Sequence, residues 1–236
     1  MATAAQRWPE GVASWALGRS RCDHCRTALA ARDLIPLISF FWLRGRCRVC
    51  REPIAGALPL SEYLAAMIAA LPFLLLPASE AVFVAIAGLL LLWLAWVDYW
   101  HWRLPLGLTA IYAALGIAHS FWLAGAPPWA DWLFATGIAA IIWSALHLLD
   151  RIFQHVRGRP GLGGGDIALL AASAYWLEPS LLAWTVFAAG LAGIVVILCR
   201  PRSMWQEPIR FGPILCAALL AVMLLGEMMQ GWLQHA

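Results

Sequence analysis

Seven apolar stretches divide the chain, and they restrict its possible folds more than any other feature of the sequence. Of the 236 residues, 63% are hydrophobic and only 12% are charged, a composition typical of polytopic membrane proteins. About 20 apolar residues span the hydrocarbon layer as a helix, because lipid offers the backbone no other hydrogen-bonding partner. The predicted helices cover residues 61–77, 79–97, 104–123, 131–150, 166–178, 180–199 and 211–230.

The arginines predict the orientation of these helices. All 16 basic residues are arginine; nine precede residue 60, and the others follow the second, fourth and sixth apolar stretches. With seven crossings these regions share one side, which the positive-inside rule makes cytoplasmic. We therefore predict an all-α, polytopic integral membrane protein of about seven transmembrane helices, with a cytoplasmic N-terminal segment (1–60) and a transmembrane domain (61–236). The net charge of +3 is too small to indicate a nucleic-acid partner.

Four cysteines in the arginine-rich segment form two CxxC pairs. Cys22 and Cys25 are separated from Cys47 and Cys50 by 21 residues, close to the spacing of zinc ribbons. Four thiolates suit a tetrahedral Zn²⁺ in a closed, structural site. The alternatives are a redox or cluster role, or replacement of one thiolate by His24. The other two cysteines, Cys199 and Cys216, lie in apolar runs and are interpreted as buried apolar residues.

Two carboxylates, Asp98 and Asp166, lie at helix ends on the predicted cytoplasmic side, the second behind three glycines, 163–165. An ionisable group beside hydrocarbon is costly and often functional, and two carboxyl groups can act as base and acid on one water. The alternative is a pair of ordinary helix-end carboxylates, with Asp166 favoured there by the helix dipole. Asp150, beside Arg151, is interpreted as an ion-paired or solvated helix end.

Several motifs follow one another between residues 20 and 230: the two cysteine pairs with residues 33–39, 43–50 and 59–62; Val97-Asp98 with Leu104-Pro105; residues 161–166; and residues 208–213. In this order they resemble the type IV prepilin peptidases, in which the second aspartate belongs to the GxGD signature of intramembrane aspartyl proteases. The resemblance implies that Asp98 and Asp166 are the catalytic pair and that Cys22, Cys25, Cys47 and Cys50 bind zinc.

The resemblance also implies an activity and a location. Such enzymes, in the bacterial inner membrane, cut the basic leader from prepilins and type II secretion pseudopilins after a glycine, at the cytoplasmic membrane face. Many then methylate the new N-terminal amine with S-adenosylmethionine. The substrate helix and the lipid bilayer are therefore the expected partners. Methylation rests on the resemblance alone.

Four departures from the family pattern support an alternative. Residues 1–20 do not supply the family's first membrane helix with its Gly-Ser-Phe-Leu-Asn element; Leu106 and Ala168 replace an Asp and a Lys; and Arg210 interrupts the Pro-Phe-Gly-Pro stretch. The alternative is a non-catalytic or truncated relative that binds pilin-like helices or assembly components. A third hypothesis, a transporter with a proton relay of paired acids, is disfavoured because the chain lacks charges deep in the membrane.

Overall fold

The computed structural model describes residues 20–22, 24–35, 38–124, 129–158, 160–205 and 209–235. Across these residues the secondary structure is helical, apart from two isolated β-bridges near the cysteine pairs. The all-α prediction is therefore confirmed for the described part of the chain. The chain forms two compact units, residues 1–70 and 71–236.

In the described residues, the first unit consists of helices and the loops that carry the cysteine pairs. The described elements are η2 (Ala31–Leu34), α3 (Ile38–Trp42) and α4 (Ala57–Ala70). Arg48 donates a hydrogen bond from Nε to Oδ1 of Asp33 at 2.8 Å, which ties η2 to the second cysteine loop. The same hydrogen bond holds the pKa of Asp33 below its usual value. A carboxylate that stays ionised keeps this link intact in mildly acidic solution.

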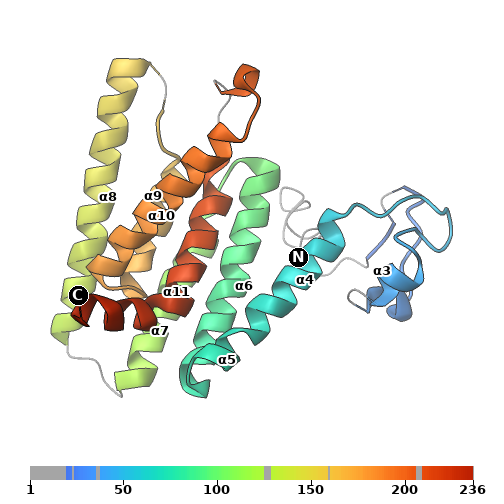
Figure 1. Cartoon of the computed structure of the whole chain (residues 1–236), viewed down its shortest axis with the longest axis horizontal. Coiled ribbons are helices and arrows are strands. Elements are labelled where there is room, and N and C mark those ends of the chain that lie inside the picture. Colours follow the sequence, from blue (N-terminus) through green and yellow to red (C-terminus); the bar gives the residue numbers. More distant parts are fainter. Residues whose placement is uncertain are drawn as a thin grey trace. The chain divides into compact units, whose positions relative to one another are not determined.

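The second unit is a bundle of apolar helices. Helix α6 packs against both α11 and α7, α9 packs against α7 and α8, and α10 packs against α11. Figure 1 shows α6 in green beside α11 in red. The elements are α5 (Pro72–Leu75), α6 (Ala78–His101), α7 (Leu106–Ala124), α8 (Trp129–Arg157), α9 (Gly164–Ala172), η3 (Ser173–Tyr175), α10 (Pro179–Leu198), η4 (Arg202–Met204) and α11 (Phe211–His235).

Among the described residues, four helical segments are long and apolar enough to cross a membrane: Ala57–Leu75, α6, α8 and α10. Two shorter apolar helices, Leu106–Trp122 and Phe211–Gly226, accompany them. Helix α9 has nine residues and rises only about 14 Å at 1.5 Å per residue, so it does not reach across the hydrocarbon layer alone. The membrane character of the chain is thus supported, and the number of seven crossings stays a prediction.

The buried core of the second unit lies where α6, α7, α9 and α11 meet. Its largest fully buried side chains are Leu91, Leu94, Val97, Tyr112, Ile167, Leu169, Leu215 and Leu219. By contrast, no residue of α8 is buried, and every residue of this helix is described. Helix α8 therefore covers one side of α9 while most of its apolar surface is left for lipid.

The turn after α9 is fixed against α7 by an aromatic stack. Trp176 lies between the rings of Tyr112 and His119, with ring centroids 5.5 and 5.3 Å away. Its indole nitrogen donates to the carbonyl oxygen of Tyr112 at 2.9 Å. A Cβ at Gly116 would lie 2.7 Å from this nitrogen, so only glycine lets the indole come so close. This stack holds the C-terminal end of α9 in place.

Candidate functional site

The four predicted zinc ligands, Cys22, Cys25, Cys47 and Cys50, come together in the first unit. Their Sγ atoms all lie within 4.8 Å of one another. The sulfurs of Cys22 and Cys50 are 3.8 Å apart, and those of Cys25 and Cys47 are 4.0 Å apart. Sulfurs bound tetrahedrally at about 2.3 Å from one Zn²⁺ would be about 3.8 Å apart. The four thiols therefore fit a tetrahedral metal ion, and His24 is exposed outside this cluster.

The two cysteine loops are built alike. In each loop the carbonyl oxygen of the first cysteine accepts a hydrogen bond from the backbone N–H of the residue four positions later. Arg26 donates to Cys22 at 2.9 Å, and Arg51 donates to Cys47 at 3.1 Å. Both arginines have left-handed backbones, with φ of 58° and 61°. Left-handed backbone at a non-glycine residue is uncommon and is kept only where the surroundings require it. Two such turns facing each other are what a four-thiolate site needs.

The pKa of Cys25 supports metal binding by this cluster. Hydrogen bonding with the side chain and backbone of Thr27 lowers the pKa of the Cys25 thiol to about 6. The thiolate is the form that binds metals. At neutral pH this cysteine therefore offers a ready ligand. Burial and the neighbouring cysteine side chains raise the pKa of Cys50 to about 12, so this thiol would lose its proton only as the metal binds.

Removal of the metal should loosen the first unit and leave the helices of the second intact. Structural zinc contributes about 10–16 kcal/mol of apparent binding free energy to small domains at neutral pH. We expect chelation, or Cys47→Ser, to increase amide hydrogen exchange and proteolysis across residues 20–55 but not in α6–α11. Cys199→Ser is the matched control, because this cysteine is exposed at the end of α10. Equal exchange in the metal-loaded and stripped proteins would contradict a structural metal.

Asp98 and Asp166 meet in the second unit. Asp98 lies in the last turns of α6 with 8% of its surface exposed, and Asp166 lies in the first turn of α9. The two carboxylates interact electrostatically. Both also interact with the thiol of Cys216, which is buried in α11. The structure therefore brings the two predicted site residues together, at the place where α6, α9 and α11 converge.

Glycines allow the backbone to approach both carboxylates. A Cβ at Gly212 would lie 2.6 Å from Oδ2 of Asp98, and one at Gly163 would lie 3.0 Å from Oδ2 of Asp166. Gly165, the residue before Asp166, packs on Leu104, where a Cβ would meet the Cβ of Leu104 at 2.5 Å and its carbonyl oxygen at 3.1 Å. No larger residue fits at these contacts without displacement. The glycine run thus has a steric role besides backbone freedom.

Arg210 interacts electrostatically with the carboxylate of Asp98. Its guanidinium lies over the rings of Tyr99 and Trp102, 4.6 and 4.5 Å from their centroids. Trp102 ends α6 with a left-handed backbone and donates its N–H to the carbonyl oxygen of Asp98 at 2.9 Å. The residue that departs from the family pattern therefore contacts the aromatic end of α6.

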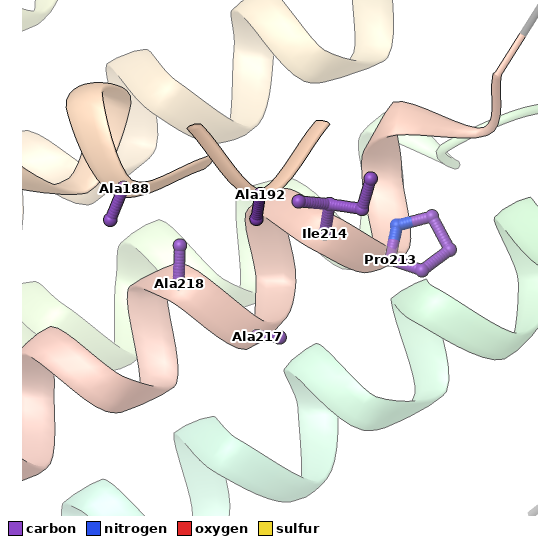
Figure 2. A pocket seen from close by; sticks show the side chains of 6 residues that line it. All are labelled: Ala188, Ala192, Pro213, Ile214, Ala217 and Ala218. Atoms are coloured by element: carbon purple, nitrogen blue, oxygen red, sulfur yellow. The ribbon is translucent and has the colours of Figure 1, made fainter. Parts of the chain in front are cut away.

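An apolar groove of about 450 Å³ lies between α10 and α11 (Figure 2). Most of the residues that line it are alanines, whose small side chains leave the space empty. The groove extends to Pro213, which follows Gly212, the glycine that contacts Asp98. Within a membrane, small residues let another helix approach closely. The lining residues are Ala188, Ala192, Pro213, Ile214, Ala217 and Ala218.

The sequence interpretation was right for Cys216 and wrong for Cys199, and Asp150 makes contacts that it did not predict. Cys216 is buried, whereas Cys199 is exposed. Asp150 was interpreted as an ion-paired or solvated helix end. Instead its Oδ1 accepts the backbone N–H groups of Gly161 and Leu162, at 2.8 and 3.0 Å. An acid in the last turns of a helix, just before a glycine-rich loop, was the signal that could have indicated this contact.

Two family models match the chain. Residues 1–76 match the Bacterial Peptidase A24 N-terminal domain, and residues 85–198 match the Type IV leader peptidase family. No solved structure matches the chain significantly.

Curated relatives match most of the chain. Three of them are named prepilin leader peptidase/N-methyltransferase. The protein from Burkholderia pseudomallei is 36% identical to this chain, that from Aeromonas hydrophila 34% and that from Stutzerimonas stutzeri 33%. These matches cover 88, 91 and 89% of this chain, and 67, 74 and 73% of the respective relatives. At this identity and coverage, and with both family models matched in order, the chain belongs to the type IV prepilin leader peptidase family of membrane proteases.

Proposed function

We propose that this chain is an intramembrane aspartyl endopeptidase that removes the leader peptides of type IV prepilins or type II secretion pseudopilins at the cytoplasmic membrane face. The observation that carries the proposal is the pairing of Asp98 with Asp166 at the junction of α6, α9 and α11. Membership of a prepilin leader peptidase family supports it. In this proposal residues 61–236 cross the bacterial inner membrane seven times, and residues 1–60 are a cytoplasmic zinc-binding segment.

The two carboxylates would cleave the peptide by general acid–base catalysis. One of them takes a proton from a water as the water oxygen bonds to the scissile carbonyl carbon, and the other donates a proton to the carbonyl oxygen. When the tetrahedral intermediate collapses, the C–N bond breaks, the leaving amine takes the proton that the first carboxylate removed from the water, and the second carboxylate regains a proton from a hydroxyl group of the intermediate. Oδ1 of Asp166 is buried and has no hydrogen-bond partner among the described residues, which leaves an acceptor for such a water.

The apolar groove supports a helical substrate. The substrate's apolar helix would pack along the small side chains of α10 and α11, with its basic leader on the cytoplasmic side. Because the groove reaches the residue beside the Asp98 contact, a helix lying in it would present its N-terminal end to the carboxylates. The bond to be cut must be unwound locally, since a regular helix hydrogen-bonds its carbonyl groups.

A second candidate activity is N-methylation of the newly exposed amine. The names of the relatives, which include N-methyltransferase, favour it. S-adenosylmethionine would be the methyl donor, and the zinc segment is the candidate region for this step.

The test is leader cleavage by the purified full chain in nanodiscs, with a prepilin-type substrate and mass spectrometry of the products. We expect one cut after a glycine at the end of the basic leader, and a mass increase of one methyl group on the mature product when S-adenosylmethionine is added. A related prepilin leader peptidase serves as the positive control. If that enzyme cuts the substrate and this chain does not, the non-catalytic alternative is favoured, in which the chain only binds pilin-like helices.

A further inference from the structure

The last two turns of α8 hold the loop that leads into the second aspartate. Asp150 accepts the N–H groups of Gly161 and Leu162 on a single oxygen, Oδ1, at 2.8 and 3.0 Å. Its other oxygen, Oδ2, accepts the side-chain amide of Gln154 at 2.6 Å. Two successive backbone N–H groups converging on one carboxylate form an anion-binding turn, here occupied by the protein's own side chain. The loop is thereby tied to a helix eleven residues earlier in the chain.

An apolar contact fixes the same loop from a neighbouring position. Gly161 lies against the ring of Phe153, where a Cβ would be 2.7 Å from Cδ1. Phe153 follows Asp150 by three residues, so both side chains project from the same face of α8. One turn of α8 therefore contacts the loop twice, through the hydrogen bonds of Asp150 and through the ring of Phe153.

The loop that is held in this way sets the position of Asp166. Leu162 is followed by Gly163, which is the N-cap of α9 and accepts the N–H of Asp166 at 3.0 Å. The same glycine packs against Oδ2 of Asp166. A shift of the loop would thus move the first turn of α9 and its carboxylate with it.

We propose that Asp150 is a positioning residue, which anchors residues 161–163 to α8 and so fixes Asp166 opposite Asp98. This inference rests on the proposed peptidase function, in which Asp166 takes part in catalysis. To anchor the loop, the side chain at position 150 must supply an acceptor oxygen, but it does not have to be charged. Asparagine supplies the same Oδ1, and Gln154 can turn its amide to accept from the new NH₂ group.

The experiment compares Asp150→Ala with Asp150→Asn in the full chain. We expect Asp150→Ala to lower kcat for leader cleavage about 10- to 100-fold with little change in KM, because small misplacement of a catalytic group costs rates of this order. Asp150→Asn should stay within about threefold of wild type. Asp131→Ala, at the exposed start of the same helix, is the matched control and should not change kcat.

Amide hydrogen exchange gives a readout that does not depend on activity. Peptides covering residues 160–165 should exchange faster in Asp150→Ala than in wild type, and at the wild-type rate in Asp150→Asn. Unchanged exchange in Asp150→Ala would overturn the anchor, as would an equal loss of kcat in the alanine and asparagine variants. If wild type itself did not cleave, the proposed function would fail, while the exchange measurement would still decide whether Asp150 holds the loop.

Discussion

Asp98→Asn and Asp166→Asn are each expected to lower the rate of leader cleavage by about 10²- to 10⁴-fold, the contribution of a positioned acid or base. Asparagine keeps the size and the hydrogen-bonding oxygen of the carboxyl group, but it can neither take nor give the proton. Since both carboxylates act on one water, the double variant should be hardly slower than either single variant. Cleavage is measured under single-turnover conditions with the prepilin-type substrate.

The control for this comparison is Asp131→Asn. Asp131 is an exposed acid in the first turn of α8, and it lies on an apolar helix as the two site residues do. It should retain wild-type cleavage, and all variants should show the same thermal unfolding as wild type. Full cleavage in both Asp98→Asn and Asp166→Asn would refute the carboxylate mechanism.

Gly165→Ala should reduce cleavage about 10- to 100-fold, because the added methyl group pushes apart the two segments that carry the aspartates. It would lie 2.5 Å from the Cβ and 3.3 Å from the Cα of Leu104, atoms that cannot rotate away. Leu104 belongs to the link that follows α6 and its Asp98, so the strain separates the carboxylates. The expected result is a lower kcat with a nearly unchanged KM.

Gly164→Ala is the matched control for this steric argument. Gly164 precedes Gly165 in the first turn of α9, so the change in helix propensity is similar, and a Cβ there meets no atom within 4 Å. We expect its kcat to stay near that of wild type. If Gly164→Ala and Gly165→Ala lowered kcat equally, backbone freedom, and not the contact with Leu104, would be the reason for the glycine run.

The sequence is sufficient for features that depend on local spacing. The CxxC pairs fix the geometry of each turn within a few residues, so a four-thiol cluster follows once the turns face each other. Successive helices that cross a membrane alternate in direction, so the side on which each helix end lies can be predicted along the whole chain. The arginines placed the ends of the helices carrying Asp98 and Asp166 on one side, and this made their proximity predictable.

Features that depend on tertiary packing were not predictable. The contact of Asp150 with Gly161 depends on how the loop folds back along α8, which no periodicity encodes. The place of Arg210 over Tyr99 and Trp102 depends on the left-handed backbone that ends α6. Hydropathy marked the fifth stretch, residues 166–178, as the shortest of the seven, but it did not indicate that α9 is nine residues long and gives way to a 3-10 turn at Ser173.

The absence of buried residues along α8 has an evolutionary consequence. A helix whose side chains contact mainly lipid can exchange one apolar residue for another without leaving a cavity, so its sequence is free to drift while its hydropathy is maintained. Selection would then preserve mainly the face of α8 that contacts the loop, from which Asp150 and Phe153 project. Such a helix tolerates adaptation to membranes of different composition, because the outer surface can change while the contacts to the loop stay fixed.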